Sequence, residues 1–308
     1  MIELESIHKR FGETVAVRDV SFRAQPGEIF GIIGPNGAGK STSIRILLNI
    51  YRADSGRVLF GNRAFREADK ERVGYLPEER GLYPKVKVAQ LLHYLARLKG
   101  TAPGDADSRI DWWLRRFDLA DRRESRTDSL SKGMSQKVQF IAAVVHDPEI
   151  LILDEPFAGL DPVSVDVLRE AITELRNAGK TVLFSTHVME QAERVCDRLL
   201  LIDRGEVVLH GTLDDIRRRF GSNSVRIEFD GDPSVLRQHS AVSELAEYPR
   251  YLEARLAEGA DSNALLRDLI EHATIHRFER VAPSLHSIFV DMVGGRRSPV
   301  NGHEEAGE

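Results

Sequence analysis

The chain has 308 residues, enough for one large domain and a smaller one. Hydrophobic residues make up 42% and charged residues 30%, which is typical of a soluble globular protein, and we find no internal repeat or low-complexity tract. Aspartate and glutamate number 48 against 43 lysine and arginine residues, and the resulting net charge of −5 gives no electrostatic reason to expect nucleic-acid binding.

The first elements along the chain are strands that lead to a glycine-rich turn. Residues 2–25 are predicted to form strands, and an apolar run at 28–33 is typical of a buried parallel strand. The sequence GPNGAGKST follows at 34–42, and the next residues, 44–48, predict a helix. Strand, glycine-rich turn and helix in this order form the context that a phosphate-binding P-loop requires.

The chemistry of this turn follows from its residue types. Gly34, Gly37 and Gly39 let the backbone wrap closely around phosphates, with successive N–H groups pointing inward. The helix beginning near Lys40 adds the positive end of its dipole, and the Lys40 ammonium supplies charge to the β- and γ-phosphates. The Ser41 hydroxyl is a candidate ligand for Mg²⁺. The complete pattern GxxxxGKS/T disfavours the alternative of a turn that merely connects two elements. The predicted nucleotide-binding loop comprises Gly34, Pro35, Asn36, Gly37, Ala38, Gly39, Lys40, Ser41 and Thr42.

The middle of the chain predicts an α/β frame with an insertion. Leucine and aromatic residues recur at helical spacing through 86–146, which predicts a helical insert. The remaining elements expected in the frame are strands at 57–60, 150–153 and 181–184, helices at 163–177 and from Val188, and a hairpin at 198–210.

Two carboxylates end the apolar strand at 150–153. A carboxylate at the C-terminal edge of a central strand faces a bound nucleotide, where Asp154 can hold Mg²⁺ through water. Glu155 can accept a proton from the attacking water or position that water. The alternative is a strand that happens to end in acidic residues, and the P-loop earlier in the chain argues against it.

The last third of the chain predicts a second domain. Residues 1–221 form the expected nucleotide-binding domain, and GSNS at 221–224 is the expected linker. Alternating apolar residues from Val225, together with predicted strands at 251–257 and 275–281 and helices at 262–272 and 284–293, indicate a small α+β domain over 222–293. Residues 294–308 lack periodicity and are expected to be disordered.

Six motifs in a fixed order resemble those of the nucleotide-binding subunit of an ATP-binding cassette (ABC) transporter. Residues 34–42 resemble the Walker A motif and ILILDE at 150–155 the Walker B motif. LSKGMSQK at 130–137 resembles the signature LSGGQ, GLDP at 159–162 the D-loop, and STH at 185–187 the switch histidine, while Phe11 matches the aromatic residue that stacks on the base. The resemblance covers about residues 2–220. It implies a P-loop NTPase fold with a RecA-like core, a β subdomain and a helical insert.

The resemblance also implies a composite catalytic site. In this family two ATP molecules are buried between two head-to-tail domains. Ser131 and Gly133, at the start of a helix, would therefore meet the γ-phosphate held by the P-loop of a second protomer. His187 would hydrogen-bond the γ-phosphate and Glu155, and Asp161 of the D-loop would belong to the nucleotide-binding set. The catalytic residues implied are Glu155, His187 and Lys40.

Three positions depart from the family pattern, and one of them is Lys87, which stands where a threonine commonly caps a helix of the insert. Glu78 stands where glutamine is usual in the Q-loop, and its carboxylate can still ligate Mg²⁺. Ser41, Glu78 and Asp154 are thus the expected metal ligands. Lys132 replaces the first glycine of the signature, but the essential Ser131 and Gly133 remain, so a competent site is expected.

The partners follow from what the chain lacks. No apolar stretch approaches the roughly 18 residues of a membrane-spanning helix, and no signal peptide is found, so any membrane span must come from another chain. The single cysteine, Cys196, excludes an internal disulfide and fits the cytosol.

We therefore expect a cytoplasmic ATPase on the inner face of a membrane, with ATP and Mg²⁺ as cofactors. Its expected partners are a multi-spanning permease and a second ATP-binding subunit, either identical or a close paralogue, and no nucleic acid is expected. The C-terminal domain resembles that of exporters of the sodium-efflux and drug-resistance branch, and the stretches 76–83 and 130–143 resemble the sodium-extruding subgroup of that branch. The alternatives left open are a soluble ABC ATPase acting on a ribosome or nucleic acid, and a regulatory domain that binds nucleotide without turnover.

Overall fold

A computed structural model describes residues 1–79, 81–220, 224–257, 259–281 and 284–295. The chain forms two compact units, Met1–Gly211 and Thr212–Glu308. This division lies before the boundary placed at residue 221 from the sequence, so the helix α7 (Leu213–Phe220) goes with the second unit. The linker expected at 221–224 lies outside the described residues except for Ser224, which begins a strand. Disorder was expected over residues 294–308. Residues 294 and 295 instead end a helix, and residues 296–308 lie outside the described residues.

The first unit begins with an antiparallel sheet. Its strands are β1 (Ile2–Phe11), β2 (Thr14–Ala24), β4 (Ser55–Phe60) and β5 (Arg63–Ala64), in the order β2-β1-β4-β5. Leu4 pairs with Phe22 on β2 and with Val58 on β4. Leu4 and Phe22 are buried and Val58 is half-buried, and these side chains pack into one core.

The central sheet carries the predicted α/β frame. Its strands are β3 (Ile29–Ile33), β6 (Val73–Leu76), β7 (Ile150–Asp154), β8 (Thr181–Thr186), β9 (Arg198–Asp203) and β10 (Glu206–Thr212), in the order β10-β9-β3-β8-β7-β6. The pairs from β9 to β6 are parallel, and β3, β7 and β8 are buried along their whole length. Continuous burial is expected of parallel strands, whose two faces are both covered. The predicted strands at 28–33, 57–60, 150–153 and 181–184 are confirmed.

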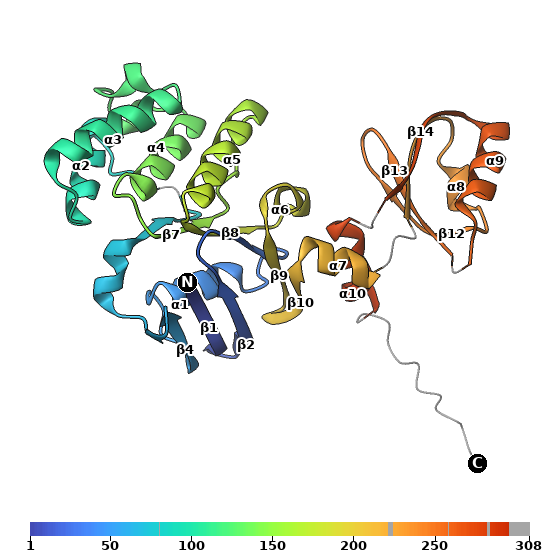
Figure 1. Ribbon diagram of the computed structural model, residues 1–308, viewed down its shortest axis with the longest axis horizontal. Helices are drawn as coiled ribbons and strands as arrows, with labels where there is room; N and C mark the ends of the chain where they lie inside the picture. Colours follow the sequence, from blue (N-terminus) through green and yellow to red (C-terminus); the bar gives the residue numbers. More distant parts are fainter. Residues whose placement is uncertain (80, 221–223, 258, 282–283, 296–308) are drawn as a thin grey trace, which may run out of the picture. The chain divides into compact units, whose positions relative to one another are not determined.

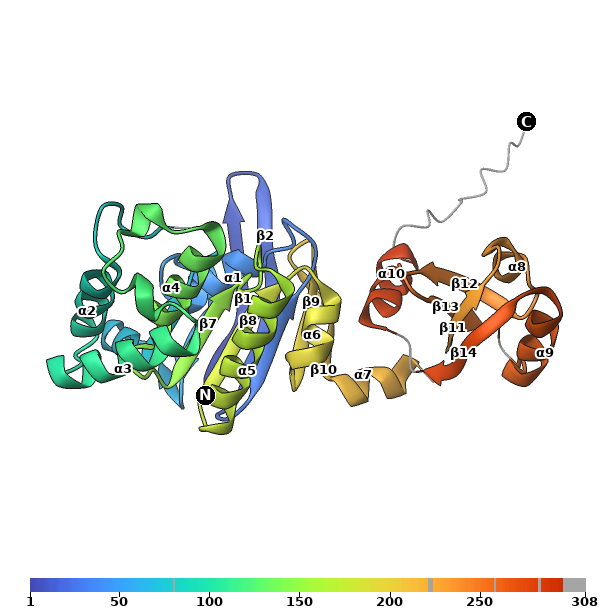
Figure 2. The same ribbon diagram turned by 90° about the horizontal axis from the view of Figure 1, so that it is seen from above.

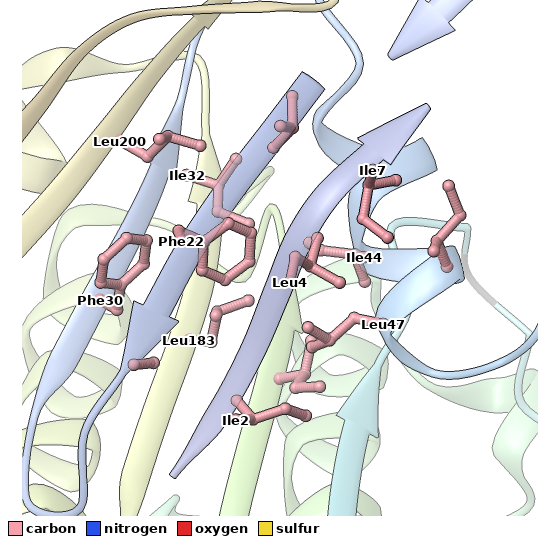
Figure 3. Close-up of a cluster of buried hydrophobic side chains, with 14 of the residues drawn as sticks. Ile2, Leu4, Ile7, Phe22, Phe30, Ile32, Ile44, Leu47, Leu183 and Leu200 are labelled. Atoms are coloured by element: carbon pink, nitrogen blue, oxygen red, sulfur yellow. The ribbon is translucent and has the colours of Figure 1, made fainter. Parts of the chain in front are cut away.

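Three helices accompany this sheet (Figure 1): α1 (Lys40–Leu47), α5 (Pro162–Asn177) and α6 (Met189–Val195). One cluster of the hydrophobic core lies between the two sheets, where α1 packs as well. Figure 3 shows Ile2 and Leu4 of β1 near Ile44 and Leu47 of α1, with Phe22 facing Phe30 and Ile32 of the central sheet. This packing fixes α1, and therefore the loop before it, relative to β3.

The helical insert is confirmed. It consists of α2 (Val88–Leu98), α3 (Pro103–Arg116) and α4 (Lys132–Val144), with short 3₁₀ turns η2 (Ala120–Arg122) and η3 (Thr127–Ser129), while a further turn, η1 (Glu67–Arg72), precedes β6. An aromatic cluster joins α3 to α4, because the ring centroids of Phe117 and Phe140 lie 5.5 Å apart and those of Trp113 and Phe140 lie 5.7 Å apart.

The second unit contains an antiparallel sheet and flanking helices. In chain order these are α7, β11 (Ser224–Asp230), α8 (Ser234–Arg237), β12 (Val242–Glu247), β13 (Leu252–Leu256), α9 (Ser262–His272), β14 (Thr274–Val281) and α10 (Leu285–Gly295). The sheet order is β12-β13-β11-β14, and Figure 2 shows α10 on one face of the sheet with α8 and α9 on the other. The predicted strands β13 and β14 and helices α9 and α10 are confirmed. The sequence analysis missed β12, whose residues are all half-buried or exposed and lack a clear apolar stripe.

Candidate functional site

The glycine-rich loop at 34–42 connects β3 to α1, as the sequence predicts. Gly34 passes so close to β9 that a Cβ atom would lie 2.1 Å from the carbonyl oxygen of Ile202. Gly39 has φ of +108° and approaches the Ala16 carbonyl of β2, which a Cβ would meet at 2.6 Å. Both approaches therefore require glycine. The loop is clamped further by a hydrogen bond from the backbone N–H of Gly205 to the Ala38 carbonyl, 2.8 Å long.

Lys40 lies at the first position of α1 with its side chain folded into the loop. Its ammonium donates hydrogen bonds to the Gly34 carbonyl at 2.8 Å and the Pro35 carbonyl at 3.1 Å. The same nitrogen lies 3.6 Å from Glu155 Oε1, and only 6% of the Lys40 side chain is exposed. A positive charge is thus held beside the loop whose N–H groups would bind phosphate.

The three residues predicted as metal ligands meet at one hydroxyl. Ser41 Oγ, in the first turn of α1, lies 3.3 Å from Asp154 Oδ1 and 3.4 Å from Glu78 Oε2. Asp154 ends β7 and is fully buried, whereas Glu78 follows β6 and is exposed. One alcohol and two carboxylate groups are the oxygen donors that Mg²⁺ prefers.

Asp154 has an oxygen available for such an ion. Its Oδ1 accepts a hydrogen bond from Ser185 Oγ, and Ser185 is its partner in the parallel register between β7 and β8. Its Oδ2 is buried and has no hydrogen-bond partner among the described residues. Because an unpaired buried carboxylate oxygen is costly, this atom fits a site built to receive a cation.

Glu155 and His187 follow two adjacent parallel strands. His187 Nδ1 lies 3.0 Å from Glu155 Oε1, and the histidine ring is about half exposed while the glutamate side chain is buried. Glu155 has φ of +50°, a left-handed conformation that is uncommon outside glycine. Its backbone N–H bonds to the Ser185 carbonyl at 3.2 Å, which helps to hold this turn.

A hollow of about 220 Å³ lies at the glycine-rich loop, and neither His187 nor Asp154 is among its described lining residues. Its lining among the described residues is Ala16, Asn36, Gly37, Gly39, Lys40, Ser41, Thr42, Glu78 and Glu155. Phe11 lies outside this lining, at the end of β1, with 45% of the residue exposed and its ring edge-on to Tyr51 at 5.4 Å. Ser131, Gly133 and Asp161 are also absent from the described lining, so the structure does not bring them to the loop of the same chain.

The signature segment forms the N-terminus of α4. Ser131 is exposed and caps the helix, because its hydroxyl accepts a hydrogen bond from the Met134 backbone N–H at 3.2 Å. A Cβ added to Gly133 would meet only Leu160, at 3.9 Å, so the backbone here faces open space.

Asp161 caps α5 in the same way and is also exposed. Its carboxylate accepts from the Ser164 hydroxyl at 2.6 Å and from the Ser164 backbone N–H at 3.0 Å. These hydrogen bonds lower the pKa of Asp161 below its usual value.

Three features of the site escaped the sequence analysis. Ser185 orients Asp154, and no local sequence signal reveals this contact, because it arises from the parallel pairing of β7 with β8. Gln136 on α4 donates to the Pro156 carbonyl at 3.2 Å and so ties the signature helix to the residue after Glu155. Tyr75 on β6 is an electrostatic neighbour of Asp154 and Glu78, and its burial, followed by the negative charge of Asp154, raises its pKa to about 12.

Across the described parts of the chain, none of the helices is both long and apolar enough to span a bilayer.

Comparison with known protein families assigns both parts of the chain. Residues 17–158 match the family model described as ABC transporter, and residues 211–293 match the model described as ATP-binding protein DrrA1-3-like, C-terminal domain. The start of the second match coincides with the division between the two compact units.

Related proteins extend over nearly the whole chain. An uncharacterised ABC transporter ATP-binding protein of Bacillus subtilis, YhaQ, is 40% identical over 294 residues, covering 96% of this chain and 99% of its own length. A Nod factor export ATP-binding protein of Burkholderia lata is 34% identical over 297 residues, covering 95% of this chain and 97% of its own length.

A solved structure shares the cassette fold. The ATP-binding subunit of an ABC transporter superposes with a TM-score of 0.68 at 33% identity, covering 72% of this chain and 93% of that one. The chain therefore belongs to the family of ABC transporter ATP-binding proteins and is an ATPase of the P-loop fold.

Proposed function

We propose that this chain hydrolyses ATP through the constellation of Glu155, His187 and Lys40, and that hydrolysis drives a separate membrane permease for export. The observation that carries the proposal is the position of Glu155 Oε1, which lies 3.0 Å from His187 Nδ1 and 3.6 Å from Lys40 Nζ. Both basic groups lie close to the same oxygen of one buried carboxylate, and Lys40 and Glu155 line the hollow at the phosphate-binding loop.

Each residue's role in ATP hydrolysis follows from its place in the site. The loop N–H groups and the N-terminus of α1 bind the phosphates, and Lys40 exchanges its carbonyl contacts for the β- and γ-phosphates. Glu155 then orients the attacking water and accepts its proton. His187, with its exposed ring, contacts both Glu155 and the γ-phosphate and so couples the carboxylate to the presence of ATP. Phe11, exposed on β1, stacks on the base.

Ser41, Asp154 and Glu78 would hold Mg²⁺. The ion would neutralise charge on the β- and γ-phosphates. The buried, unpaired Asp154 Oδ2 and the convergence of Asp154 and Glu78 on the Ser41 hydroxyl support this assignment.

A second copy or close paralogue completes the site. Ser131 and Gly133 lie at an exposed helix N-terminus that is not part of the described lining of the same chain's hollow, and Asp161 caps another exposed helix start. An exposed helix N-terminus binds anions, so ATP held by one chain would bridge to the signature segment of its partner. ABC ATPase domains typically dimerise in this way and pair with a permease.

Export to the outside of the cytoplasmic membrane is the transport direction that the second unit supports. The match to a DrrA1-3-like C-terminal domain and the likeness to a Nod factor export ATP-binding protein over both units favour an exporter. The ATPase would then be peripheral on the cytoplasmic face, and sodium ions or drugs are candidate cargoes.

Purification from the native host tests this function against a soluble switch on a ribosome or nucleic acid. Tagged protein from gently solubilised membranes should co-purify with a multi-spanning protein, and vesicles containing both should hydrolyse ATP faster than the chain alone. Recovery of the tagged chain only with ribosomes, and no ATPase stimulation in vesicles, would contradict the transport role.

A further inference from the structure

The second unit contains a cavity of about 390 Å³ that the transport function does not use. It lies between the sheet and α10, which covers the sheet face opposite α8 and α9 (Figure 2). The strands contribute Glu253, Arg255 and Glu244, and α10 contributes His286, Ser287 and Val290.

A buried carboxylate borders this cavity. Glu253 on β13 is only 3% exposed. Its Oε1 accepts a hydrogen bond from the Ser284 backbone N–H at 2.9 Å, just before α10 begins. Its Oε2 is buried and has no hydrogen-bond partner among the described residues. One oxygen therefore holds the residue before α10, and the other is left for a group that enters the cavity.

Two arginines share this face of the sheet, and neither is paired with Glu253. Arg226 is the cross-strand neighbour of Glu253, but its guanidinium carbon lies 4.4 Å from the centroid of the Tyr251 ring. Arg255 lies two residues along β13 and is paired instead with Glu244, at 3.6 Å. Within the described residues Glu253 forms no ion pair, so its charge lacks a cationic partner although it is buried.

The residues that line the cavity limit which kind of cation could pair with Glu253. Among the described residues, no group of three or more acidic, histidine or cysteine side chains is placed to hold a metal ion. Ala246, the cross-strand neighbour of Glu253 on β12, and Val290 on α10 give the cavity an apolar side. A ligand for such a site needs one N–H⁺ group and an apolar body.

We infer that this cavity binds a primary organic ammonium ion with a short apolar chain. The ammonium donates a charge-assisted hydrogen bond to Glu253 Oε2, and the alkyl chain packs against Ala246 and Val290. The site lies wholly within the second unit and is independent of the ATP site.

Isothermal titration of the full-length protein with hexylammonium tests this assignment. We expect saturable binding that 1-hexanol, which lacks the charge, does not reproduce. Glu253→Gln keeps an amide oxygen for the Ser284 N–H and should weaken binding about tenfold or more, since a charge-assisted bond is lost. The matched control Glu271→Gln, exposed on α9, should bind as wild type does, and so should Lys40→Ala, because the nucleotide site is not involved.

The inference is overturned if hexylammonium does not bind, if hexanol binds equally well, or if a folded Glu253→Gln protein binds with unchanged affinity. Should Glu253→Gln fail to fold, Val290→Trp decides. Val290 lines the cavity and is about half exposed, so a bulky residue there should block entry and abolish binding. Unchanged affinity in a folded Val290→Trp protein contradicts the site.

Discussion

His187 Nδ1 lies 3.0 Å from Glu155 Oε1, and this contact links the ends of the neighbouring parallel strands β7 and β8. The glutamate is buried and held in a left-handed turn, whereas the histidine ring is half exposed. The fixed partner is thus the carboxylate, and the partner that a bound phosphate can reach from the open side is the imidazole.

Glu155→Gln should retain ATP binding and lose hydrolysis. The amide preserves size, but the water loses its base, and removal of a positioned base typically costs ~10²–10⁴-fold in rate. Steady-state phosphate release together with nucleotide binding measures both effects. Glu174→Gln on the exposed part of α5 is the control and should hydrolyse ATP as wild type does. A wild-type rate in Glu155→Gln would remove Glu155 from the mechanism.

Lys40→Ala should abolish high-affinity ATP binding. The ammonium is a buried positive charge beside the loop, so its removal takes away the loop's own lysine contact to the β- and γ-phosphates. Isothermal titration with ATP measures the loss. Lys180→Ala serves as the control, because Lys180 is paired with Asp147 at the far end of β8. Equal affinities for Lys40→Ala and wild type would contradict the role assigned to the loop.

Glu78→Ala should raise the Mg²⁺ concentration needed for half-maximal ATPase activity, and should reduce stimulation by the permease more than basal turnover. Glu78 Oε2 lies 3.4 Å from the Ser41 hydroxyl, in the segment between the central sheet and the helical insert. Glu78→Gln should keep much of both activities, because its amide oxygen still reaches the metal. Glu79→Ala is the matched control, since the Glu79 side chain is 91% exposed. Superimposable Mg²⁺ titrations of wild type and Glu78→Ala would show that Glu78 has no role in metal binding.

Asp69 should make the first unit sensitive to acid. The hydrogen bond from Arg63, 2.7 Å long, lowers the pKa of Asp69 to about 2. Because the pKa is lower in the folded state, the ionised Asp69 stabilises the fold at pH values above the ordinary aspartate pKa. This stabilisation is lost as the pH falls from about 4 to about 2.

Asp69→Asn should therefore lower the free energy of unfolding by about 1–2 kcal/mol near neutral pH, allowing for the partly exposed Arg63. The difference from wild type should shrink in urea unfolding at pH 3, whereas Glu67→Gln, in the exposed first turn of η1, should have little effect at either pH. A difference that does not change with pH would contradict this role for the Arg63 pair.

Local sequence signals predicted most of the central frame. The strand–loop–helix around Lys40 and the carboxylates after β7 could be placed because buried parallel strands give continuous apolar runs, and phosphate loops need glycine at particular positions. The helical insert was visible from leucine spacing. The convergence of Ser41, Asp154 and Glu78 also followed, since Asp154 ends β7, Glu78 follows β6, and Ser41 lies in the first turn of the helix after the loop that leaves β3.

Contacts between residues far apart in the chain could not be predicted from the sequence. The bond between Ser185 and Asp154 depends on the order of strands in the sheet, which no local pattern encodes. β12 escaped because its residues are half-buried or exposed, so apolar alternation is weak there. The unpaired Glu253 depends on α10 packing over the second face of the sheet, and a lone glutamate in a strand gave no signal of it.

The most direct test of the composite site is analytical ultracentrifugation of Glu155→Gln with and without Mg-ATP. The γ-phosphate should join Lys40 of one chain to Ser131 and Gly133 of the other. The 34.6 kDa chain is therefore expected to sediment as a monomer, or as a weak dimer, without nucleotide and as a tight dimer with Mg-ATP. Adding Ser131→Arg to Glu155→Gln should abolish that increase while leaving ATP binding intact. A mass that Mg-ATP does not change would contradict the proposal that two copies of this chain share each ATP.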